Sequence, residues 1–235
     1  MRWIYRSAAA AASAGLVAFL ILSPAVAAQE LAGATKGGWT LRGFGARLGT
    51  TGDTLHSGPP IDPFPPVIES SFTLDDGSGA GLALEYLATR RLGIEALAIR
   101  ADLDGVLRVR ALDQVSPEGT LTRDVSCDLY GVGLNLHLTP GRRADVYLGP
   151  LVALARYGDF RADLGGLTFV TDLDDDTAFG VTLGTDVALG RSRNWALTAS
   201  ARRLWATAVR GRSGRDLDLD PLIAAAGVAY RWGGS

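Results

Sequence analysis

The segment from Asp220 to Trp232 constrains the fold more than any other part of the chain. Its apolar row consists of Leu222, Ala224, Ala226, Val228, Tyr230 and Trp232. The alternate row is small or charged and consists of Ala225, Gly227, Ala229 and Arg231. A period of two indicates a β-strand. In a soluble sheet the second face would carry more polar side chains, so this pattern favours a strand with one face on lipid and the other on a polar lumen.

Residues 1–27 have the pattern of a secretory signal peptide. Arg2 and Arg6 precede an apolar stretch from Ala8 to Leu22, and Ala25-Val26-Ala27 forms an A-x-A cleavage site. The apolar stretch has about 15 residues, fewer than the ~20 that a spanning helix needs. We therefore expect export, removal of residues 1–27, and a single domain over residues 28–235.

The exported part has no apolar segment long enough for a transmembrane helix. A chain that crosses a membrane without helices must close its strands into a barrel, because unpaired backbone groups cannot face lipid. Cys127 is the single cysteine, so an internal disulfide is impossible. The formal charge of −2 does not favour a nucleic-acid partner. No metal, phosphate-loop or nucleotide motif is present, so no cofactor is expected.

Glycine, proline and aspartate clusters divide the exported part into eight segments of strand length. They are residues 39–49, 79–89, 92–103, 127–139, 144–157, 177–190, 195–209 and 219–232. Each reaches the ~9–11 residues that a tilted strand needs to cross a bilayer. Tight turns alternate with long polar links at residues 50–78, 104–126, 158–176 and 210–218, as in bacterial outer-membrane barrels. We predict an all-β, eight-stranded antiparallel up-and-down barrel in the outer membrane.

Facing, aromatic residues and charge support this prediction. Alternation is clean in the segments 79–89, 127–139, 177–190 and 219–232 and noisier in the other four. In one of these four, residues 144–157, Pro150 predicts a bulge, because proline cannot donate to the ladder. Membrane-interface aromatics are expected near the short turns at Trp39, Tyr86, Trp195, Tyr230 and Trp232, and near the long links at Tyr130, Tyr157, Phe179 and Trp205. The short turns carry Arg90, Arg91, Arg142, Arg143, Arg191 and Arg193, whereas the long links are acidic. The acidic links are interpreted as solvated loops, with cation bridging to lipid as the alternative.

Three pieces of the chain resemble the OmpW family of small outer-membrane barrels. Asp220-Pro221-Leu222 leading into Gly227–Trp232 resembles its closing strand, Leu136–Gly141 with Val146–Gly149 looks like its middle hairpin, and Gly38–Arg42 lies where its first strand begins. The wider group that includes the OmpA membrane domain shares many of these features. The resemblance implies a narrow, partly apolar interior and, as in the family, passage of small hydrophobic molecules.

The implied partners are outer-membrane lipid, the assembly machinery acting through the C-terminal strand, and small hydrophobic solutes. The chain departs from the family at its end, where Gly233-Gly234-Ser235 follows Trp232. Such barrels usually end on the aromatic residue that the assembly machinery reads.

Eight strands leave an interior that is filled by side chains or holds one small ligand, which excludes a general diffusion pore. The leading hypothesis is a conduit or binding barrel for small hydrophobic molecules. Its lumen-lining candidates are Glu85, Glu95, Asn135, His137, Asp186, Arg202 and Arg231. These side chains either contact a solute or form a paired network, because buried charges persist only when they are partnered. Small residues such as Gly131, Gly184 and Gly227 either leave a gap for a ligand or relieve crowding.

Two other classes of function stay open. The first is a structural or surface-interaction protein with a plugged barrel, whose proline-rich link at residues 50–78 binds a partner. The second is an outer-membrane lipid hydrolase or acyltransferase, which needs a nucleophile beside a base. His56 lies in a link, and Thr139 near His137 is a poor nucleophile, so we do not expect an enzyme.

Overall fold

The computed structural model describes residues 36–50, 54–57, 68–111, 118–171, 173–206, 209–210, 216–217 and 219–233. Within these ranges, no helix is long and apolar enough to cross a membrane. The expected signal peptide and the prolines at residues 59–66 lie outside the described residues.

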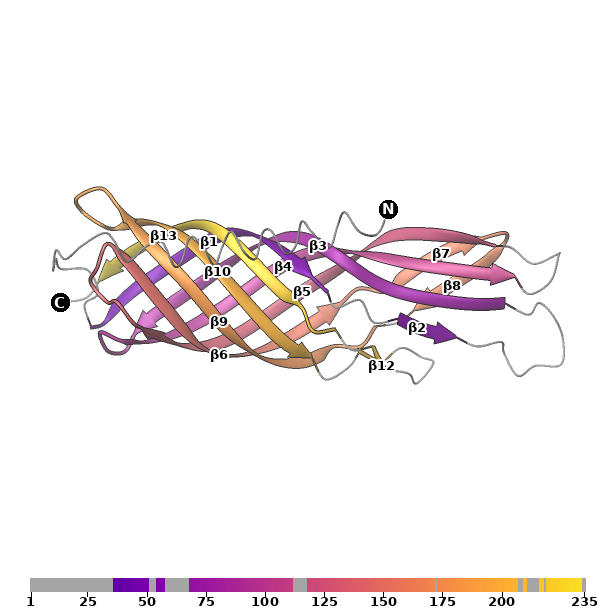
Figure 1. The fold of residues 1–235 in the computed structure, drawn as a ribbon, viewed down its shortest axis with the longest axis horizontal. Helices are drawn as coiled ribbons and strands as arrows, with labels where there is room; N and C mark the ends of the chain where they lie inside the picture. Colours follow the sequence, from indigo (N-terminus) through magenta and orange to yellow (C-terminus); the bar gives the residue numbers. More distant parts are fainter. Residues whose placement is uncertain are drawn as a thin grey trace.

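Eight antiparallel strands among the described residues form a closed ring (Figure 1). They are β1 (Gly38–Gly49), β3 (Ile68–Leu87), β4 (Leu92–Ala111), β5 (Gly119–His137), β6 (Ala144–Tyr157), β9 (Asp176–Leu189), β10 (Trp195–Ala206) and β13 (Leu222–Gly233). Strand β1 pairs with both β13 and β3, which closes the ring. The predicted eight-stranded barrel is therefore confirmed.

The side chains of each strand alternate between an exposed outer face and a buried inner face. In β13, Leu222, Val228 and Trp232 are exposed while Ile223 and Ala229 are buried. The eight expected interface aromatics of the ring all lie on the outer face, with exposed fractions from 36% to 57%: Trp39, Tyr86, Tyr130, Phe179, Trp195, Trp205, Tyr230 and Trp232. Tyr157 differs, because it is only half-exposed and packs against the apolar core.

Strands β3, β4 and β5 extend far beyond the other five at the long-link end (Figure 1). The links predicted at residues 50–78 and 104–126 are therefore wrong in part, because much of both segments is strand. Strand β2 (Thr54–Ser57) pairs with the end of β3. Residues 158–176 also contain a hairpin of β7 (Phe160–Leu164) and β8 (Leu167–Thr171), and residues 209–217 contain the short pair β11 (Val209–Arg210) and β12 (Asp216–Leu217).

One bulge separates the barrel from this extension. The register between β3 and β4 shifts by one residue between Leu74 and Gly77. Because side chains alternate with a period of two, the extra residue turns Phe72 and Leu74 inward. Inside the extension, the ring centroid of Phe72 lies 4.9 Å from that of Phe160.

The bulge predicted at Pro150 is wrong. Strands β5 and β6 keep one register from Gly133–Leu151 to Leu136–Leu148. The two intervening pairs, Leu134–Pro150 and Asn135–Gly149, are missing from the ladder. Proline has no N–H to donate, so the pairing is interrupted without an inserted residue.

Candidate functional site

The side chains inside the barrel form two layers. In the half near the short turns they form a group that we call the charged plug: Arg42, Glu85, Glu95, Asn135, His137, Asp145, Asp186, Arg202 and Arg231. In the half toward the long links they form the apolar chamber: Phe44, Leu48, Leu97, Ile99, Leu103, Leu129, Leu151, Leu204 and Ile223. The charged plug thus closes the apolar interior at the short-turn end.

Arg42 is the centre of the charged plug. Its Nη2 lies 2.7 Å from Glu85 Oε2 and 2.8 Å from Asp186 Oδ2, and its Nη1 lies 3.3 Å from Glu95 Oε2. The guanidinium carbon also stands 4.7 Å from the ring centroid of Tyr147. One planar guanidinium therefore connects carboxylates from three strands, which is the geometry that arginine provides and lysine does not.

A second branch of the plug runs through His137. Its Nδ1 lies 2.9 Å from Asp145 Oδ2 and its Nε2 lies 3.0 Å from Glu85 Oε1. Because ionised carboxylates only accept hydrogen bonds, both ring nitrogens are donors when both carboxylates are ionised, and the ring is then an imidazolium. The amide of Asn135 also donates to Glu85 Oε1 at 2.8 Å and so helps to fix the same carboxylate.

The remaining arginines complete the network. Arg202 donates to Glu95 Oε1 at 3.2 Å and to Ser200 Oγ at 2.8 Å. Arg231 has a side chain that is 14% exposed and lies 2.9 Å from Asp186 Oδ2. With His137 charged, four cationic side chains face the four carboxylates of Glu85, Glu95, Asp145 and Asp186. Buried charges are tolerable only in such a paired arrangement.

All seven lumen candidates named from the sequence lie in this plug. Arg42 and Asp145 were not among them, although Arg42 holds the network together. A signal for Arg42 existed: Trp39 marks the outer row of β1, and a residue three positions later belongs to the inner row. The network arrangement, rather than free lumen side chains, is what the geometry displays.

The inward glycines relieve crowding. A Cβ at Gly184 would overlap the ring of Tyr147, and a Cβ at Gly93 would overlap the carboxylate of Glu85. At Gly131 a Cβ would stand 3.0 Å from the Leu151 side chain. These glycines therefore make room for large neighbours across a narrow barrel and leave no ligand-sized gap.

The apolar chamber is nearly filled. A cavity of about 10 Å³ lies at its upper end, lined among others by Leu48, Leu103, Leu129, Leu204 and Leu219. That volume is about one water-sized sphere. The buried Cys127 also lines it and packs as an apolar side chain.

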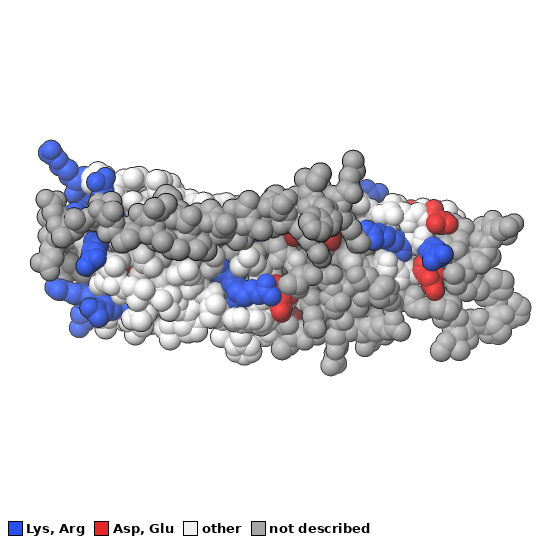
Figure 2. Space-filling view, viewed as in Figure 1, with Lys and Arg blue, Asp and Glu red and all other residues white. Residues whose placement is uncertain are grey.

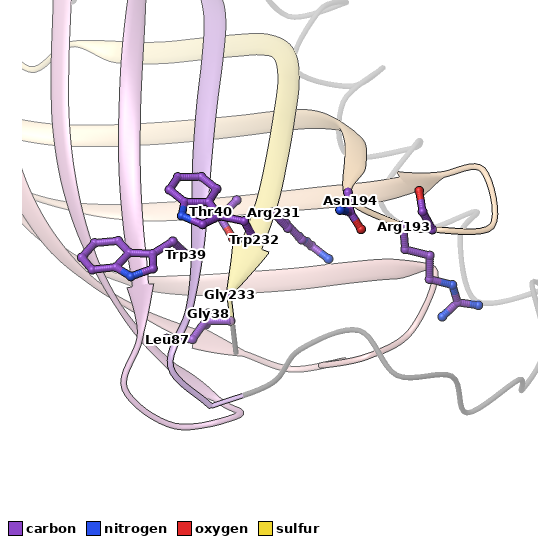
Figure 3. A pocket seen from close by; sticks show the side chains of 10 residues that line it. Gly38, Trp39, Thr40, Leu87, Arg193, Asn194, Arg231, Trp232 and Gly233 are labelled. Carbon is purple, nitrogen blue, oxygen red and sulfur yellow. The ribbon is translucent and has the colours of Figure 1, made fainter. Parts of the chain in front are cut away.

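A larger hollow opens at the short-turn end of the lumen (Figure 3). Its volume is about 220 Å³, and its lining includes Thr40, Leu87, Asn194, Arg231 and Trp232. Arg231 belongs both to this hollow and to the charged plug. The charged plug therefore separates this open hollow on the short-turn side from the apolar chamber on the long-link side.

The hydrolase arrangement is not assembled around His137. Both of its ring nitrogens are engaged by Asp145 and Glu85. Thr139 Oγ1 donates to the carbonyl of Ala144 and accepts from the N–H of Val146, so it caps the turn. The side chain of His56 lies outside the described residues, and no cluster of metal-ligating side chains occurs in the described part of the chain.

Known proteins resemble the chain over nearly its whole length. The structure is similar to that of the outer membrane protein OprG from Pseudomonas aeruginosa, with a TM-score of 0.64, 19% identity, and coverage of 87% of this chain and 100% of that one. AlkL, solved in lipid bilayers, matches with a TM-score of 0.53, 15% identity and coverage of 88% and 95%. Neisserial surface protein A matches with a TM-score of 0.50, 16% identity and coverage of 84% and 100%.

No curated protein sequence matches the chain. The family model for the outer membrane protein β-barrel domain matches residues 18–231. The expected resemblance to small OmpW-like barrels is confirmed at the level of the fold. The chain therefore belongs to the outer membrane protein β-barrel domain family.

Proposed function

We propose that this outer-membrane barrel takes up small hydrophobic molecules from the long-link side into its apolar chamber. The observation that carries the proposal is the apolar chamber resting on the charged plug. Burial of apolar surface attracts an apolar solute into the chamber at about 25 cal/mol per Å². The leucine, isoleucine and phenylalanine side chains that line this half of the lumen supply that apolar surface.

The charged plug argues against straight passage toward the short turns. To cross it, an apolar solute would have to separate Arg42 from three carboxylates in a water-poor interior. Breaking a buried ion pair by removing a partner costs about 3–5 kcal/mol. An exit through the barrel wall into lipid avoids this cost.

The wall has a weak seam at the height where the chamber meets the plug. The β5–β6 ladder lacks the pairs Leu134–Pro150 and Asn135–Gly149. The backbones of β5 and β6 nevertheless lie close together here, as the overlap of a Cβ placed at Gly149 with the carbonyl of Leu134 demonstrates. Separation of the strands at this point breaks fewer hydrogen bonds than elsewhere, which favours it as the site of lateral release.

The test is transfer of a fluorescent apolar probe into lipid vesicles that contain the refolded barrel. Ala178 is buried, and it lines the cavity of the chamber. We expect Ala178→Phe to slow the transfer, because the larger side chain occupies the chamber. Ala226→Phe makes the same change on the lipid-facing side of β13 and is the matched control. Equal rates in the two variants would contradict the proposal.

A surface-interaction protein is the second candidate function. It is favoured by the long extension of β3, β4 and β5 with the β7–β8 hairpin, and by the nearly filled lumen. In that case the wild-type barrel would transfer the probe no faster than protein-free vesicles. Deletion of residues 160–171 would then abolish partner binding and leave the barrel folded.

A further inference from the structure

The exposed charge at the short-turn end is an arginine rim. It consists of Arg90, Arg91, Arg142, Arg143, Arg191 and Arg193. Five of these side chains are exposed, and Arg193 is half-buried. Figure 2 displays basic atoms gathered at this end of the molecule, whereas acidic atoms lie toward the middle and the other end.

The three turns that carry the arginine rim are tied to one another. The N–H of His137 donates to the carbonyl of Arg91 at 2.7 Å, which links the β3–β4 turn to the end of β5. The N–H of Ala188 donates to the carbonyl of Arg143 at 2.7 Å, and Arg193 Nη1 donates to the carbonyl of Gly141 at 3.3 Å. The β5–β6 and β9–β10 turns, which together carry four arginines, are therefore joined to each other.

Three exposed arginines toward the long-link end have acidic partners, whereas most of the arginine rim, like Arg108, Arg110, Arg123 and Arg161, has none among the described residues. Arg47 faces Asp76, Arg100 faces Asp128, and Arg156 faces Asp175 at 3.2–3.8 Å. Among the described residues, no carboxylate forms an ion pair with Arg90, Arg91, Arg142, Arg143 or Arg191. The nearby carboxylates of Glu85, Asp145 and Asp186 are buried in the charged plug.

Arg193 occupies a backbone conformation that favours glycine. Its φ is +57°, the only positive value at a non-glycine residue in the described part of the chain. Such strain persists where the surrounding structure or the function requires it. Glycine would relieve this strain, and the arginine that stands here donates from its side chain to the carbonyl of Gly141 in the neighbouring turn.

The arginine rim lies beside the aromatic belt of the same end. Trp39 packs on Tyr86 with ring centroids 4.8 Å apart, and Trp195 packs on Tyr230 at 4.9 Å. Tryptophan and tyrosine rings of this kind sit at the depth of the lipid headgroups. Guanidinium groups at that depth face phosphates, to which arginine binds bidentately.

We propose that the arginine rim is a binding surface for the phosphate groups of anionic phospholipids in the leaflet at the short-turn end. Charge complementarity selects an anionic lipid over a zwitterionic one, because Arg90, Arg91, Arg142, Arg143 and Arg191 gather positive charge at one end of the barrel without an ion pair among the described residues. Each basic residue near an anionic leaflet is worth about a fivefold change in binding.

The test is native mass spectrometry of the barrel released from nanodiscs with equal amounts of phosphatidylglycerol and phosphatidylcholine. We expect the wild type to retain phosphatidylglycerol preferentially. The variant R142Q/R191Q should lose that preference by about fivefold per arginine. The matched control is R100Q/R156Q, which removes two exposed arginines at the opposite end and should keep the preference. Heat-modifiable gel migration verifies that each variant is folded.

Arg193→Gly sharpens the test, because it removes the side chain and relieves the backbone strain. We expect this variant to resist unfolding at least as well as the wild type and to retain less phosphatidylglycerol. Equal retention of the two lipids by the wild type would overturn the proposal, as would an R142Q/R191Q variant that matches R100Q/R156Q. Loss of the retained lipid on addition of millimolar inorganic phosphate would mean that the rim binds free phosphate rather than phospholipid, and would overturn the proposal.

Discussion

Arg42 is the residue on which the charged plug depends. We expect Arg42→Met to destabilise the barrel by about 3–5 kcal/mol, because Glu85, Glu95 and Asp186 lose their shared cation in a buried site. Urea unfolding in lipid vesicles, followed by tryptophan fluorescence, measures the change. Arg47→Met on the same strand is the control. Its side chain is 73% exposed, so its effect should stay within about 0.5 kcal/mol. Equal stability of the two variants would refute the account of the plug.

Gly184 and Tyr147 test whether the inward glycines make room for large side chains. Gly184→Ala should cost about 1–3 kcal/mol, because the new Cβ overlaps the Tyr147 ring. In the double variant with Tyr147→Ala the cost of Gly184→Ala should largely vanish, since the obstructing ring is gone. The readout is the coupling free energy in a double-mutant cycle. Strictly additive effects would mean that the two residues do not crowd each other.

At the scale of elements, the sequence predicts the strands well where the two faces differ in polarity. Strand β6 has the predicted bounds, 144–157, and the other barrel strands begin and end near their predicted short turns. The extension escaped prediction because Asp75-Asp76-Gly77 and Asp104-Gly105 have the composition of turns. In the structure the first of these segments forms the bulge and the second faces it. A strand that rises above the membrane can carry aspartates on its solvated face.

The resemblance implied a partly apolar interior, but the residues of the apolar chamber escaped prediction for a related reason. Period-two alternation detects a difference between faces, and an apolar lumen removes that difference. In β4, Leu97 and Ile99 point inward while Leu92 and Ile94 point outward, so the segment reads as noise. Most of the charged plug was foreseeable because ionisable residues on the inner row of a cleanly alternating strand stand out, whereas Arg42 and Asp145 lie in the noisier segments 39–49 and 144–157 and were missed.

The bulge in β3 can be tested by deletion. Removal of Asp75 should turn Phe72 and Leu74 to the solvated face, because a shift of one residue reverses every side chain. We expect trypsin to cleave the extension at Arg108 or Arg110 faster than in the wild type. Asp75→Asn keeps the chain length and should cleave at the wild-type rate. An unchanged cleavage rate after the deletion would show that the bulge does not set the facing.

The seam beside Pro150 has its own test. Pro150→Val supplies the missing N–H, so the β5–β6 ladder should close and transfer of the apolar probe should slow. Val152→Ile, at the next outward position of β6, should leave the rate unchanged. If the Pro150→Val barrel transfers the probe at the wild-type rate, release does not occur through this seam.

At the scale of the whole molecule, the two ends of the barrel differ in both charge and interior. The short-turn end combines the charged plug with the arginine rim, and the long-link end combines the apolar chamber with a tall, acid-bearing extension. Such a division is what the proposed uptake of apolar solutes and the proposed contact with lipid phosphates both require. Neither layer is visible in overall composition, because the net charge is only −2.

Ion conductance in a planar bilayer tests most directly whether the charged plug closes the lumen. We predict that the folded, inserted wild-type barrel carries no measurable current, while the same preparation still transfers the apolar probe into vesicles. Discrete openings in the wild type, blocked when an apolar solute is added, would contradict it. They would establish a continuous conduit through Arg42 and its carboxylates.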